Sequence, residues 1–148
     1  YLLHFGFCFS GLSFYQFFNE KFPNNDLQKY SLALSNLLLG LSVAFLFFAY
    51  DKLYTVISFA LLLVVLFSIE YIGKLRFMYR AYRTALFLLL PFYVVYALIM
   101  NVHAITANND EIVGLNLFSV PIETACSFFS AILIAIYSFE YLKSSNKA

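Results

Sequence analysis

Apolar residues along the chain fall into five long runs, which short polar stretches separate. The runs cover residues 2–18, 30–49, 53–69, 85–102 and 121–141. Each run has close to the roughly 20 residues that a helix needs to cross the hydrocarbon core of a bilayer. The pattern therefore predicts an all-α bundle of about five transmembrane helices, which forms a single domain over residues 1–148.

The connection between the second and third runs contains only Tyr50, Asp51 and Lys52. So short a connection predicts that these two helices are antiparallel neighbours. The third run is rich in Leu, Val and Ile and has almost no polar face, so we expect it to face lipid. The first, fourth and fifth runs are then expected to form the polar centre of the bundle. Pro91 falls inside the fourth run, a position that membrane helices tolerate.

Composition supports a membrane protein, because 63% of the residues are apolar and only 11% are charged. Soluble domains carry about 25% charged residues. The net charge of +1 comes without a basic arm, so nothing indicates a nucleic-acid partner. Cys8 and Cys126 lie inside apolar runs without CxxC spacing, which favours packing residues over a disulfide or a zinc site.

Basic residues are distributed unevenly between the two sides that five alternating spans define. Only Lys52 lies on one side. The other side carries eight of the nine basic residues, namely Lys21, Lys29, Lys74, Arg76, Arg80, Arg83, Lys143 and Lys147. Basic residues accumulate on the cytoplasmic side of membrane proteins. The C-terminus is therefore predicted to be cytoplasmic.

Most polar groups of chemical interest gather on the opposite, outer side. These residues are His4, Asn101, His103, Asp110, Glu111 and Glu123. Ionisable residues in membrane spans are costly and suggest function, although an interfacial histidine is also stable when water hydrates it. Pro121 predicts a helix start two residues before Glu123, where an acid also interacts favourably with the helix dipole. A chemical role and a helix-starting role for Glu123 both remain open.

Four short segments resemble one family. They are Tyr-Asp-Lys-Leu-Tyr-Thr at 50–55, Leu-Pro-Phe-Tyr at 90–93, Asp-Glu-Ile-Val-Gly-Leu at 110–115 and Val-Pro-Ile-Glu at 120–123. Their order and spacing resemble the membrane-embedded lycopene cyclases of the heterodimeric bacterial and fungal bifunctional type. Members of the fused form have two similar halves, each with a Pro-x-Glu-acid motif. The resemblance implies the second half of such a protein, preceded by the last helix of the first half, in a bacterial inner membrane. The chain begins at Tyr1 inside an apolar run, so we expect it to be the C-terminal part of a longer two-repeat protein.

Several positions depart from the family pattern. Thr124 stands where the second acid of the motif is expected, and Asn116 stands where an Arg is usual. Val102 and Ala107 replace expected glycines. Loss of the acid together with the Arg suits a diverged member that has lost its charged site or acts on another substrate.

The resemblance implies redox-neutral cyclisation of a carotenoid end group, a reaction of the intramolecular lyase or isomerase type. An acid protonates a terminal alkene, the cation closes a ring, and a base removes a proton. The implied catalytic residues are Glu123, His103 and Asn101. Burial in an apolar site raises the pKa of a carboxylic acid and so keeps it protonated near pH 7. Aromatic faces stabilise a cation by about 0.5–2 kcal/mol each, and the candidates for substrate binding are Tyr93, Tyr96 and Phe128.

No GxGxxG or phosphate-binding loop occurs in the sequence, so we expect no nucleotide cofactor and no metal. The expected partners are membrane lipid, a carotenoid or isoprenoid substrate, and a larger membrane complex or a second copy of the chain. Two alternatives to a cyclase remain open. In the first, the protein is a non-catalytic subunit that kept the fold. In the second, it binds a metal through His4, His103 and Glu123.

Overall fold

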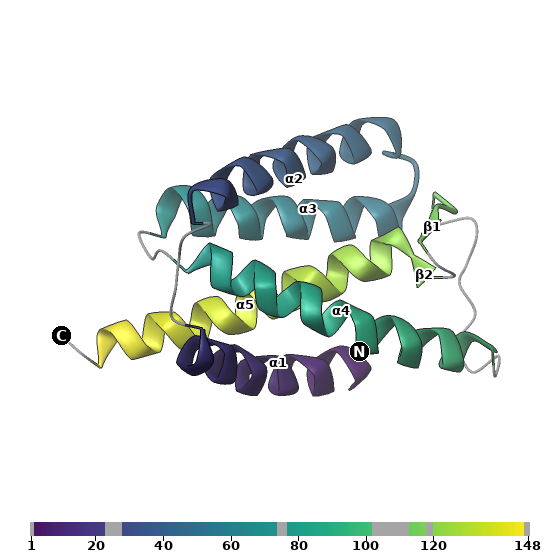
Figure 1. The fold of residues 1–148 in the computed structure, drawn as a ribbon. Coiled ribbons are helices and arrows are strands. Elements are labelled where there is room, and N and C mark those ends of the chain that lie inside the picture. The colour runs from purple at the N-terminus through teal and green to yellow at the C-terminus, as the bar shows by residue number, and fades with distance from the viewer. Residues whose placement is uncertain (1, 23–27, 74–76, 102–112, 118–119, 147–148) are drawn as a thin grey trace.

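The computed structural model describes residues 2–22, 28–73, 77–101, 113–117 and 120–146, and these ranges form a helical bundle (Figure 1). Its helices are α1 (Leu2–Lys21), α2 (Gln28–Phe48), α3 (Leu53–Phe67), the π-helix η1 (Ser68–Ile72), α4 (Met78–Asn101) and α5 (Ile122–Ser145). The two-residue strands β1 (Asn116–Leu117) and β2 (Val120–Pro121) pair antiparallel directly before α5. The predicted all-α class is confirmed.

Four helices in the described ranges are long and apolar enough to cross a membrane. They cover Lys29–Phe48, Leu53–Ile72, Met78–Asn101 and Ile122–Ser145. Helix α1 is 20 residues long but is not one of them. Its polar residues His4, Gln16, Asn19 and Glu20 lower its hydropathy below that of the other helices. An integral membrane protein is thus supported, with α1 as the most polar of the five predicted spans.

Helices α2 and α3 form the predicted antiparallel hairpin, which the tight turn at residues 49–51 closes (Figure 1). The rings of Phe45 and Phe59 stack across it, with their centroids 4.5 Å apart. On its other face α3 packs against α5, and α1, α4 and α5 contact one another. The proximity predicted for the second and third apolar runs is therefore confirmed.

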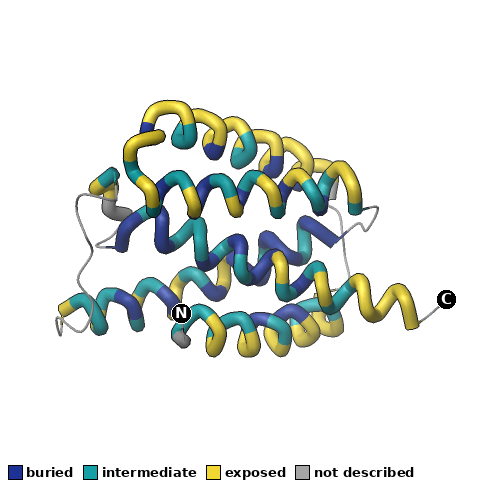
Figure 2. Tube along the Cα trace, turned by 180° about the vertical axis from the view of Figure 1, so that it is seen from behind, coloured by how far each residue is buried: buried dark blue, intermediate teal, exposed yellow. Residues whose placement is uncertain are grey.

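The prediction that the third run faces lipid is wrong for one side of α3, which packs between α2 and α5 (Figure 1). Its other side, with Ile57, Leu61 and Val64, is exposed as predicted. Helix α2 is the most exposed layer of the bundle, and most of its trace is exposed in Figure 2. In contrast, α3 buries Thr55, Ser58, Phe59, Leu62 and Leu66. A helix that is apolar on every side is as compatible with a protein interior as with lipid, so hydropathy cannot decide between the two.

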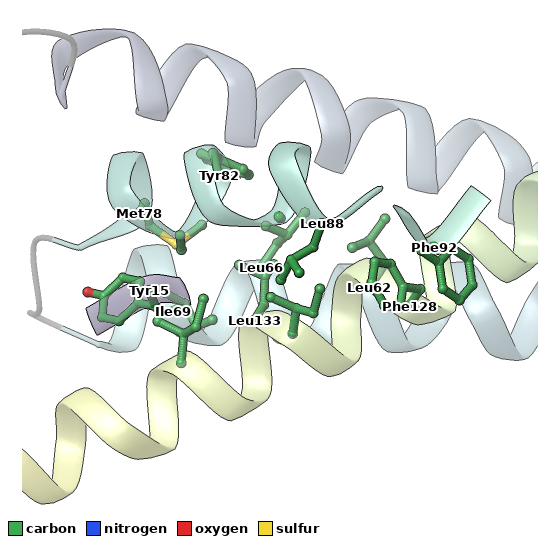
Figure 3. Packing of buried hydrophobic residues seen from close by; sticks show 14 of the residues in the cluster. Tyr15, Leu62, Leu66, Ile69, Met78, Tyr82, Leu88, Phe92, Phe128 and Leu133 are labelled. Carbon is green, nitrogen blue, oxygen red and sulfur yellow. The ribbon is translucent and has the colours of Figure 1, made fainter. Parts of the chain in front are cut away.

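Large side chains from α3, α4 and α5 fill the centre of the bundle (Figure 3). Leu62, Leu66, Leu88 and Leu133 meet there with at most 2% of their surface exposed. Towards one end of this core Phe92 and Phe128 lie face to face (Figure 3). Both rings contact His4 at this end of the core.

The described basic residues divide between the two ends of the bundle as the alternating spans predict. Five of them lie in α1, α2, α4 and α5 near one end, namely Lys21, Lys29, Arg80, Arg83 and Lys143, whereas Lys52 lies in the turn at the other end (Figure 1). Arg83 also closes the end of α1, because its guanidinium donates to the carbonyl oxygens of Phe18 (3.1 Å) and Phe22 (3.4 Å). We call this end the basic end.

Candidate functional site

The start of α5 is fixed by the short strand pair before it. The amide of Ile122 donates to the carbonyl oxygen of Leu115 at 3.0 Å. Gly114 has a φ of 79°, a left-handed conformation that glycine adopts without strain and that turns the chain towards β1. Pro121 stands at the N-cap position with extended backbone, so the helix begins at Ile122. Glu123 is thereby held in the first turn of α5.

The carboxylate of Glu123 is completely buried, with an exposed fraction of 0%. Its Oε1 accepts a hydrogen bond from the Thr55 hydroxyl (2.8 Å) and another from the Val113 amide (2.9 Å). Its Oε2 has no hydrogen-bond partner among the described residues. The carboxylate therefore joins α3, α5 and the segment before β1, and it retains one oxygen that can accept or carry a proton.

A cavity of about 460 Å³ lies beside this carboxylate, between α1, α3, α4 and α5. Its lining residues are Leu3, His4, Tyr54, Ile57, Ser58, Leu61, Tyr96, Ile99, Thr124 and Ser127. Glu123 does not line the cavity, whereas Thr124, the next residue in α5, does. The position at which the family motif carries its second acid thus faces the cavity, and here it bears a hydroxyl group.

His4 brings the N-terminal part of α1 into the cavity wall. Its ring packs edge-on against Phe92 and Phe128, with centroid distances of 5.6 and 6.1 Å. It also lies near the main chain of Thr124. Both ring nitrogens are buried, and neither makes a well-formed hydrogen bond to the described part of the chain. His4 therefore lines the cavity, but neither of its ring nitrogens is open to it.

Four aromatic rings pack against one another in and behind the cavity wall. Phe92 and Phe128 stack with centroids 3.9 Å apart and an interplanar angle of 12°. Phe7 packs edge-on against both, and Tyr96 lies 5.8 Å from Phe92. Such faces are suited to a developing positive charge. The same contacts would also be made by a purely structural aromatic core.

The predicted site residues lie in different surroundings. Tyr96 lines the cavity, while Phe128 is fully buried behind it. Tyr93 is half-buried, and its hydroxyl has no hydrogen-bond partner within the described ranges. Asn101 ends α4 with an exposed side chain. His103, Asp110 and Glu111 lie outside the described residues.

Four residues in or next to this region were not predicted from the sequence as site residues. Thr55 and Ser58 were hidden because the third run was assigned to lipid, although two hydroxyl residues three apart in an apolar run are a usable signal. Ser127 lies in the last apolar run, and no sequence pattern singles it out. Phe92 stands directly after Pro91, and nothing in the sequence separates it from the many other aromatic residues.

The alternative metal site depended on His4, His103 and Glu123. Within the described ranges, no group of three His, Cys, Asp or Glu residues is placed to hold a metal ion. His103 falls outside those ranges.

The chain matches the family model for lycopene cyclase over residues 51–142, which is more than half of its length. The chain belongs to the lycopene cyclase family. In this family member the match begins in the α2–α3 turn and runs into the last turns of α5, so it includes Thr55, Ser58, Glu123 and Thr124 but not His4. No curated protein and no solved structure gives a significant match.

Proposed function

We propose that this lycopene cyclase family member catalyses the redox-neutral, acid–base cyclisation of a carotenoid end group and that Glu123 is its acid. The observation that carries the proposal is the fully buried Glu123 carboxylate, whose Oε2 has no partner among the described residues. In a family that performs acid–base chemistry on a hydrocarbon, a buried acid with a spare oxygen is the group best suited to proton transfer.

The reaction requires no electron transfer and no co-reactant. The acid adds a proton to the terminal alkene, the neighbouring double bond attacks the resulting cation, and a ring bond forms. A base then removes a proton from the ring and restores the alkene, so substrate and product are isomers. Glu123 supplies the proton, while Tyr96 offers its ring to the cation from the cavity wall. Phe128 lies behind that wall, stacked on Phe92, and remains a proposed substrate-binding residue. His103 and Asn101 remain proposed participants in the proton removal.

The cavity has a volume of about 460 Å³, within the range of about 300–1,000 Å³ that is typical of ligand pockets. It is suited to one end group, while the polyene chain remains among the apolar helices and lipid. Because Glu123 does not line the cavity, its proton must reach the end group by a rotation of the side chain or through one water.

A second candidate function is a non-catalytic membrane subunit, and two observations favour it. The hydroxyl of Thr55 and the amide of Val113 already bind Glu123, as expected for a carboxylate that only links elements. Thr124 provides no ionisable group in the cavity. In this role the protein would bind a larger membrane complex or a second copy of itself.

Glu123→Gln tests the first proposal, because glutamine has nearly the same shape but cannot exchange a proton. The full-length protein is expressed in cells that accumulate lycopene, and separately in cells that accumulate a terminally hydroxylated acyclic carotenoid. We expect wild type to form rings from at least one pigment and the variant to lose about 10²–10⁴-fold in rate. Absence of rings in wild type, or equal activity of the variant, would contradict the proposal.

We further propose that the protein resides in a bacterial inner membrane with its C-terminus in the cytoplasm. The grouping of five described basic residues at the basic end supports this orientation.

A further inference from the structure

Several helical serines of the chain satisfy their hydroxyl groups within their own helix. Ser42, Ser130 and Ser138 each donate to the carbonyl oxygen four residues earlier, at 2.8 Å. A serine in the middle of a helix commonly satisfies its hydroxyl in this way. This state provides the comparison for the hydroxyl groups that line the cavity.

Three cavity residues depart from that state. No hydrogen bond joins the hydroxyl groups of Ser58, Thr124 or Ser127 to any other described residue. Ser58 and Thr124 are each only 4% exposed and both line the cavity, so a molecule inside the cavity is the partner available to their hydroxyl groups. A buried polar group without a partner is costly, which indicates that another molecule supplies the bonds.

His4 lines the same cavity from the facing helix. Its two ring nitrogens have almost no accessible surface, so they are not open to a ligand in the cavity. The cavity wall therefore presents hydroxyl groups from α3 and α5 as its open polar groups. A pure hydrocarbon end group such as that of lycopene has no atom that could satisfy them.

We infer that this cavity binds an acyclic isoprenoid end group that carries a hydroxyl or carbonyl oxygen, with Ser58 and Thr124 as its hydrogen-bonding partners. The isoprenoid part of this ligand rests on the proposed function, whereas the oxygen rests on the cavity alone. Thr124 then replaces an acid with a neutral donor and acceptor. That exchange suits an uncharged oxygen in a low-dielectric site, where an ionised group would be costly.

The test is pigment binding by the full-length protein purified in lipid nanodiscs. The probes are lycopene and its derivative with a tertiary hydroxyl on the end group, and the readout is pigment retained per protein across a concentration series. We expect wild type to bind the hydroxylated pigment at least about 10-fold more tightly than lycopene, because a site built for a polar group discriminates against its absence.

Variants then assign the preference to the cavity. Thr124→Val and Ser58→Ala should each weaken binding of the hydroxylated pigment by about 2- to 10-fold and leave lycopene binding unchanged. Thr124→Ser keeps the hydroxyl and should retain the preference, which separates a lost hydrogen bond from a misfolded protein. Ser138→Ala is the matched control on α5, since its hydroxyl bonds to its own helix outside the cavity.

Equal binding of the two pigments, or an undiminished preference in Thr124→Val, would overturn the inference. Conversion of lycopene to an alcohol by wild type would also overturn it, because water rather than a substrate oxygen would then occupy the polar wall. These outcomes are distinct from failure of the proposed function, since binding is measured without ring formation. Glu123→Gln should keep the preference in binding even where it abolishes rings.

Discussion

Buried or half-buried carboxylates occur at both ends of the bundle, and the two ends treat them differently. At the basic end, the hydroxyl of Ser35 lies 2.6 Å from Oε1 of Glu70 and is also bonded to the Tyr82 hydroxyl. The hydroxyl of Tyr15 donates to Oε1 of Glu140 at 2.7 Å. Both acids are only half-buried. At the other end, Glu123 is fully buried beside a cavity whose own polar groups lack partners.

This difference separates acids that hold helices together from an acid suited to chemistry. Glu70 and Glu140 each join helices that are distant in sequence, and their partial exposure lets water complete their hydrogen bonds. Glu123 also joins elements, but its side chain is 0% exposed and one oxygen is left over within the described chain. The proposed function assigns chemistry to this end because of that acid and the polar groups of the cavity beside it, and we call it the functional end.

The largest expected difference between the ends is in ring formation. Glu123→Gln should lower the rate by about 10²–10⁴-fold, whereas Glu140→Gln should change it by less than about 3-fold, because the glutamine oxygen still accepts the bond from Tyr15. Pigment composition in cells that accumulate acyclic carotenoids measures both. Equal losses in the two variants would show that either acid acts only through folding.

The second-largest effect is expected for substitutions in the hydrophobic core at the functional end. Phe128→Ala removes a fully buried ring that stacks on Phe92, and it should lower the free energy of unfolding by about 3–5 kcal/mol. Phe5→Ala is the matched control, since that ring is 76% exposed and should change stability by only about 0.5 kcal/mol. Reversible unfolding in mixed micelles measures the two values, and a similar cost for both would disprove the assigned core.

Hydrogen bonds to the acids should show a smaller contrast. Thr55→Val removes a donor to the fully buried Glu123, so we expect a loss of about 1–3 kcal/mol of stability. Ser35→Ala removes the partner of the half-buried Glu70 and should cost about 0.5–1.5 kcal/mol, because water can take its place. The same unfolding assay ranks them, and a larger loss in Ser35→Ala would reverse the proposed difference between the ends.

The orientation of the two ends can be tested with almost no energetic effect. In a chain without Cys8 and Cys126, Ser145→Cys should resist a membrane-impermeant thiol reagent in intact cells and react after permeabilisation. Lys52→Cys, in the turn at the opposite end, should react without permeabilisation. Both sites are at the ends of helices, so stability should change by about 0.5 kcal/mol or less. Labelling of Ser145→Cys from outside would invert the topology.

Much of the fold could be predicted from the spacing of apolar runs. The α2–α3 hairpin followed from a three-residue connection, and the start of α5 followed from Pro121. The centre of the bundle could not be predicted, because α2 and α3 are both apolar and hydropathy does not show that α3 packs between α2 and α5. The candidate site was predicted in part. Glu123 and Tyr96 were found from local patterns, whereas the pairing of Glu123 with Thr55 joins residues 68 positions apart.

The sequence by itself determined that this is a helical membrane protein of the lycopene cyclase family with an acid at the start of its last helix. Hydropathy, connection length and motif order are local properties, and each can be read without knowing which helices touch. Only the tertiary structure decided that Thr124 rather than Glu123 faces the cavity and that His4 and Ser58 face the same space. Helix rotation and helix neighbours set those facts, and both depend on side-chain packing between distant segments.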